Sequence, residues 1–207
     1  MRTKNIIACL LLLFAAQAVS AQNNADAILR VLIDQIKSHK NVEMVFNYQL
    51  SPDGKDLGNS EKGHAWLQGE AYKTEMADQQ TISDGKTIWL YLIDDEEVMI
   101  SNADEGADNT PLKILTSLDE NYAATLTNID AQGNAIIELA NPKGQYKRVT
   151  LKINAKKSEL KSLDIYMEDG NKFNITVEEM KYDQNLDDNF FTFDTKKHPK
   201  VDVIDMR

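Results

Sequence analysis

The hydrophobic pattern of the chain changes from a helical period to a strand period near residue 40. Over residues 25–39, apolar side chains recur every three or four positions, at Ile28, Leu29, Leu32, Ile33 and Ile36. A helix places such positions on one face, so this segment predicts an amphipathic helix. From Met44 onward, apolar and polar residues alternate, which is the period of a half-buried strand.

Turn residues divide the rest of the chain into about eleven predicted strands. These strands are expected at 43–50, 62–68, 70–77, 79–83, 87–92, 98–101, 123–129, 135–140, 146–153, 160–168 and 172–182, and a short extended stretch ends at Val203. Thr110-Pro111 is typical of a helix start, with Thr110 as the N-cap. So many consecutive strands do not fit a flat sheet with one solvated face, so the sheet has to curl into a barrel or half-barrel.

One face of the predicted sheet is rich in large apolar side chains. Its candidate residues are Met44, Phe46, Tyr48, Leu50, Leu67, Tyr72, Met76, Trp89, Leu163, Ile165, Met167, Phe173, Ile175 and Val177. The predicted second helix would cover this concave surface with Pro111, Leu112, Ile114, Leu115 and Leu118. Met and aromatic side chains adapt to varied apolar shapes. Periodicity alone is explained by an ordinary core, and it does not distinguish a filled core from a cavity for acyl chains.

The N-terminus has the features of a secretory signal peptide. A short basic segment, MRTK, precedes an apolar stretch that ends at Val19-Ser20-Ala21. We expect cleavage after Ala21, which leaves residues 22–207 as a single exported domain. A membrane anchor is the lesser alternative, because the apolar stretch is short. A lipobox at Cys9 is a second alternative, but most of the apolar run follows Cys9 rather than preceding it.

Charge and cysteine content narrow the range of partners. The net charge is −10, and an acidic chain is unsuited to nucleic acid or anionic lipid surfaces, both of which attract Lys and Arg. The single cysteine, Cys9, lies in the predicted signal peptide. The mature chain would then have no cysteine, which excludes a disulfide framework and a cysteine-based zinc site. We expect a monomer.

The sequence offers no arrangement of residues typical of an enzyme. His39, His64 and His198 have no second ligand at metal-binding spacing, and no G-x-S-x-G or glycine-rich phosphate motif occurs. The stretch Asp183-x-Asn185-x-Asp187 resembles the start of a calcium loop. It has Asp188 where such a loop needs Gly, and Asp194 in place of the final Glu. We therefore expect no catalysis, no metal and no cofactor.

Several motifs together resemble the LolA-like outer-membrane lipoprotein carriers. Gly63-His64-Ala65-Trp66-Leu67 is similar to the G-x-L-W strand of that family, and residues 83–91, SDGKTIWLY, are similar to its S-D-G-K-x-x-W-x-Y hairpin. Residues 110–115, TPLKIL, resemble the Pro-started lid helix of the family. The ending, Phe191-Thr192-Phe193 through residues 201–205, is similar to the family C-terminus.

The resemblance implies a fold and a function. The fold is mainly β (α+β), an incomplete antiparallel barrel of about eleven strands with helices over its concave apolar face. The function is to bind the acyl chains of lipoproteins in the periplasm. The chain would carry lipoproteins from an inner-membrane releasing transporter to an outer-membrane acceptor. A lipid- or lipoprotein-sensing domain of the same fold is the alternative, and an enzyme is a third class.

The sequence departs from the family at one position that matters for the lid. Better-known carriers have an Arg shortly after the G-x-L-W strand, and that Arg ties down the lid. Here Gln68-Gly69-Glu70 occupies that place, with no Arg. The resemblance therefore implies a lid, while the departure predicts that the lid is held differently.

Overall fold

The computed structural model describes residues 24–103, 111–116, 122–140 and 146–207. Within them an N-terminal helix covers residues 24–38, close to the predicted segment. The signal peptide, Cys9, Thr110 and Leu118 fall outside the described residues. No helix within the described ranges is both long enough and apolar enough to cross a membrane.

The strands follow the predicted alternation closely. The first six are β1 (Val42–Ser51), β2 (Glu61–Gln68), β3 (Ala71–Glu75), β4 (Gln79–Ser83), β5 (Thr87–Leu92) and β6 (Glu97–Asn102). After α2 (Pro111–Thr116) come β7 (Ala123–Ile129), β8 (Asn134–Ala140), β9 (Tyr146–Asn154), β10 (Glu159–Met167), β11 (Lys172–Tyr182) and β12 (Asp202–Asp205). Two 3₁₀ turns, η1 (Pro52–Gly54) and η2 (Thr195–Lys197), lie in the connections.

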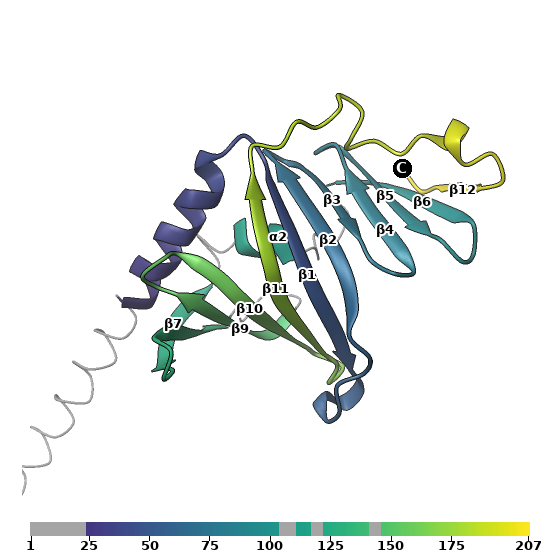
Figure 1. Cartoon of the computed structure of the whole chain (residues 1–207). Helices are drawn as coiled ribbons and strands as arrows, with labels where there is room; N and C mark the ends of the chain where they lie inside the picture. The colour runs from purple at the N-terminus through teal and green to yellow at the C-terminus, as the bar shows by residue number, and fades with distance from the viewer. Residues whose placement is uncertain (1–23, 104–110, 117–121, 141–145) are drawn as a thin grey trace, which may run out of the picture.

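The strands form one curved sheet that does not close (Figure 1). Their order is β12-β6-β5-β4-β3-β2-β1-β11-β10-β9-β8-β7, so β7 and β12 are the two edges. The long strands β1 and β11 pair at the centre and join the two halves of the chain. All neighbours are antiparallel except β12, which runs parallel to β6. The predicted incomplete barrel is confirmed, and the tail contributes a twelfth strand.

Cross-strand register places the predicted apolar positions on one face. Met44 lies opposite Ala65 on β2 and Met180 on β11, and all three face the same side of the sheet. An irregularity between Val45 and Phe46 shifts the register without moving the apolar residues to the other face. Both helices pack against this concave face, because their apolar residues belong to the same buried cluster.

Gly63 is required by the close approach of the Phe46 ring. A Cβ at Gly63 would lie 2.5 Å from Cζ of Phe46, whose side chain is fully buried. We expect Gly63→Ala to lower the free energy of unfolding by about 1–3 kcal/mol, because the ring has to move within a packed core. Chemical denaturation measures this loss.

The clash also predicts how the variant is rescued. Adding Phe46→Leu to Gly63→Ala removes the ring that meets the new methyl group. The double variant should therefore lose less stability than the sum of the two single losses. Simple additivity would show that the Phe46 ring is not what makes Gly63 necessary.

Candidate functional site

The concave face gathers most of the residues predicted to form an apolar surface. A single buried cluster contains Met44, Phe46, Tyr48, Leu67, Tyr72, Leu163, Ile165 and Ile175, and the partly buried Met76, Met167, Phe173 and Val177 pack against it. Leu50 lies near the end of β1 opposite Phe173 and is 40% exposed, so it belongs to the rim. We call this surface the concave wall.

Trp89 is a correction to the predicted set. Trp89 lies opposite Ile82 on β4 and Ile100 on β6. The same cross-strand row continues through Lys73 on β3 to Trp66 on β2, and its side chains face the convex side of the sheet. Strand β5 is apolar on both faces because the C-terminal segment covers its outer side. Phe193 of that segment packs against Tyr91, with ring centroids 5.2 Å apart. Alternation therefore could not show which face of β5 is inner.

The concave wall also includes residues that were not among the predicted candidates. They come from the strands at the β7 end of the sheet and are Ala135, Ile137, Leu139, Val149, Leu151, Ile153 and Leu160. The residues of β9 and β10 alternate with polar neighbours, whereas in β8 Ala135 and Ile137 flank the apolar Ile136. This alternation marked them as strand residues, but it did not indicate which strands share a face with β1.

Helix α2 covers the concave wall with its apolar side chains. Leu112, Ile114 and Leu115 are at most 1% exposed and lie in the same cluster as the wall residues, and Pro111 is also buried. Figure 1 shows α2 behind the plane of β1 and β11, on the inner side of the sheet. The apolar side chains of this helix occupy the surface that an acyl chain would contact.

An ion pair joins α2 to the turn between β2 and β3. Lys113 Nζ donates to Glu70 Oε2 at 2.7 Å, and the ammonium lies 5.9 Å from the centroid of the Tyr72 ring. The hydrogen bond and charge of Lys113 lower the pKa of the Glu70 carboxyl. Lys37 on the N-terminal helix lowers it further by its charge. Glu70 thus lies in the segment where the resemblance implied an Arg, and it contacts α2 through an ion pair with Lys113.

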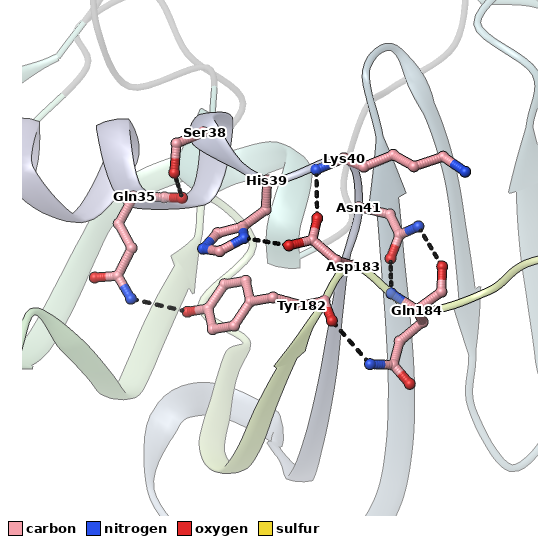
Figure 2. A network of polar contacts seen from close by, with 8 residues as sticks. All are labelled: Gln35, Ser38, His39, Lys40, Asn41, Tyr182, Asp183 and Gln184. Carbon is pink, nitrogen blue, oxygen red and sulfur yellow. Dashed lines mark hydrogen bonds and ion pairs between the residues drawn. The ribbon is translucent and has the colours of Figure 1, made fainter.

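The C-terminal end of the N-terminal helix is fastened to β1 and β11 (Figure 2). Asp183 Oδ2 lies 2.7 Å from His39 Nδ1, and its Oδ1 accepts from the backbone N–H of Lys40 at 2.7 Å. These contacts lower the pKa of the Asp183 carboxyl. The buried Asn41 side chain accepts from the N–H of Gln184 at 2.8 Å and donates to its carbonyl at 2.9 Å.

A pocket opens where the N-terminal helix faces β7. Its volume is about 420 Å³, and its lining combines four charged residues with four others: Asp26, Arg30, Asp34 and Lys37, and Leu29, Ile33, Tyr122 and Ala124. Leu29, Ile33 and Ala124 also belong to the core cluster. Solvent therefore reaches the edge of the apolar interior at this point.

Asp183, the first residue of the stretch that resembles a calcium loop, has a structural role in the fold. Both carboxylate oxygens of Asp183 are engaged by residues 39 and 40. Throughout the described part of the chain, no three His, Cys, Asp or Glu side chains are grouped as a metal site requires.

A family model matches more than half of the chain. The model for outer membrane lipoprotein carrier protein LolA matches residues 72–194. An outer-membrane lipoprotein carrier protein from Francisella tularensis is 26% identical over 98% of this chain and 97% of its own length. A protein of the same description from Pseudomonas paraeruginosa is 30% identical over 61% of each chain.

A solved structure shares the architecture at low sequence identity. An uncharacterized conserved protein from Thermus thermophilus superposes with a TM-score of 0.55 and 11% identity. The match covers 85% of this chain and 98% of that one. At this identity the likeness concerns the fold alone.

Proposed function

The chain belongs to the outer membrane lipoprotein carrier (LolA) family, and from this we propose that it carries lipoproteins by binding their acyl chains against the concave wall. The single observation that carries the proposal is the burial of the apolar face of α2 on that wall. Moving α2 aside would expose a contiguous apolar surface built from both halves of the sheet. Acyl chains are ligands of matching chemistry.

The energetics favour a carrier of this kind. Each buried CH₂ contributes about 0.8 kcal/mol, so a long acyl chain in water is unfavourable by on the order of 10 kcal/mol. A lipoprotein therefore needs an apolar partner to cross an aqueous compartment. Because α2 competes for the same wall, cargo affinity is the difference between binding the chain and displacing the helix. This competition supports release as well as binding.

The route of the cargo is part of the proposal. We place the protein in the periplasm after removal of residues 1–21. Cargo would arrive from an inner-membrane releasing transporter and leave to an outer-membrane acceptor. The pocket between the N-terminal helix and β7 borders Leu29, Ile33 and Ala124 of the core cluster, which supports it as a place where a chain enters.

Native mass spectrometry of the protein purified from its own periplasm tests the function. We expect co-purified lipoproteins or species with bound acyl chains. A matched preparation of the Leu115→Glu variant serves as the reference. Its α2 carries a charge that the apolar wall disfavours, so the amount of acyl chain that co-purifies should change. Protein that is reproducibly empty in the wild type would contradict the carrier function.

The Glu70–Lys113 pair should hold α2 in its closed position. We expect Glu70→Gln to speed hydrogen exchange of the α2 amides by up to about fivefold, because an exposed ion pair contributes about 0.2–1 kcal/mol. The pKa of Glu70 is lowered in the closed form. The ion pair therefore stabilises the closed position of α2 fully above the ordinary Glu pKa of 4.5. This stabilisation is lost as pH falls through the lowered pKa of Glu70.

Glu159→Gln is the matched control for the lid contact. It removes another exposed ion pair of 2.7 Å, between Glu159 and Lys161 on β10. Exchange of the α2 amides should not change in this variant. Equal exchange in wild type and Glu70→Gln at neutral pH would show that the pair does not restrain α2.

A further inference from the structure

The concave wall contains a polar atom that the fold does not satisfy. Thr74 is the second-last residue of β3 and is 5% exposed. Its Oγ1 is buried and has no hydrogen-bond partner among the described residues. Buried hydroxyls are nearly always paired in folded proteins, because an unpaired one forfeits its hydrogen bond to water. An orphan hydroxyl in a binding wall therefore suggests a partner supplied by a ligand.

Register places the Thr74 side chain on the concave wall. It lies opposite Ala65 on β2 and Thr81 on β4, in the row that begins with Met44 on β1. Tyr72 is its neighbour two positions away on the same face. The hydroxyl is therefore set in a surface that is otherwise apolar.

Charged groups of β3 face the other way. Lys73 and Glu75 alternate with Thr74 and pair with each other on the convex side, with a contact of 2.7 Å. The nearby wall hydroxyl of Tyr48 is already engaged, because it donates to Glu61 at 2.7 Å and accepts from the Ala77 N–H at 3.2 Å. Burial raises the pKa of Tyr48 to about 12, so this phenol stays neutral. Thr74 thus offers a neutral hydrogen-bond donor to the wall.

The chemistry selects the kind of group that Thr74 can bind. A neutral hydroxyl in an apolar surface suits an uncharged acceptor and does not suit a phosphate or a carboxylate, which need opposite charge when buried. Acylated cargo carries such an acceptor at the head of each chain, as an ester or amide carbonyl oxygen. Resting on the carrier function proposed above, we propose that Thr74 Oγ1 donates a hydrogen bond to the carbonyl oxygen of a bound acyl chain. Thr74 is then a positioning residue that sets how deep the chain lies.

Two lipopeptides that differ in one functional group test the proposal. The first is a dipalmitoyl S-glyceryl-cysteine peptide with two ester carbonyls, and the second is its dialkyl ether analogue, which has none. Thr74→Val keeps the side-chain shape and removes the donor. We expect it to weaken binding of the ester peptide by about tenfold, or about 1.4 kcal/mol, and to leave the ether peptide unchanged. A palmitoyl-amide peptide shows whether an amide carbonyl serves as well.

Matched variants separate recognition from structure. Thr74→Ser retains the hydroxyl and should restore ester binding, while Thr81→Val removes a hydroxyl from the same row and should not discriminate between ester and ether. Empty Thr74→Val should be at least as stable as wild type in chemical denaturation, because it loses an unpaired polar group. Equal loss of ester and ether binding, or no loss of either, would overturn the role of Thr74 alone. If the wild type bound neither the ester peptide nor the ether peptide, the carrier function would be overturned, and this role of Thr74 with it.

Discussion

Crosslinking α2 to the β2–β3 turn should abolish acyl-chain binding. Glu70→Cys and Lys113→Cys can be joined by a reversible bis-methanethiosulfonate reagent that spans about the length of the present ion pair. The ion pair already places these two side chains in contact. With α2 held on the concave wall, an open state that binds cargo is no longer populated. We expect affinity for a diacyl lipopeptide to fall by about 100-fold or more.

The reagent chemistry supplies its own control. A reductant should restore binding in the same sample, measured by titration with a fluorescent lipopeptide. Glu159→Cys with Lys161→Cys, crosslinked in the same way on β10, should bind as wild type, because that pair does not touch α2. Retained binding by the crosslinked lid variant would contradict displacement of α2 as the opening step.

Shortening a lid side chain should raise cargo affinity, whereas shortening a wall side chain should not. Leu115 on α2 and Leu151 on β9 are both 0% exposed, so either change to Ala should lower the free energy of unfolding by about 2–5 kcal/mol. Leu115→Ala weakens the competitor of the cargo. We expect its lipopeptide affinity to rise about tenfold or more, since 1.4 kcal/mol corresponds to a factor of ten.

Leu151→Ala damages the surface that both the lid and the cargo use. Its affinity should be unchanged or lower, although its stability falls by a similar amount. Denaturation and lipopeptide titration of the two variants side by side measure both effects. A change of affinity in the same direction for both variants would show that α2 and cargo do not compete for one surface.

Most of the secondary structure could be predicted from alternation and turn residues. The predicted strand at 87–92 is β5, and the predicted strand at 172–182 is β11, each with the same bounds. Such segments can be predicted locally, because the pattern of polar and apolar residues in a short stretch indicates which positions are exposed. The helix start at Pro111 follows the same local logic.

The site was harder to predict where both faces of a strand are covered by other segments, and where two contacting residues lie far apart in the sequence. Trp89 and Ile88 are both apolar, and only the covering of the convex face by the C-terminal segment explains why Trp89 faces away from the wall. The lid contact is a second case. The sequence showed Glu70 in place of an Arg, but its partner Lys113 lies 43 positions away on a different element.

The sequence by itself determined the elements, the apolar character of one sheet face and the family resemblance, because period, turn chemistry and motif spacing are properties of short segments. The tertiary structure alone decided the pairing of β12 with β6, the side to which Trp89 belongs, the partner of Glu70 and the missing partner of Thr74 Oγ1. Each of these depends on which segments meet after the sheet curves, and contacts between distant segments follow from packing of the whole chain rather than from local preference.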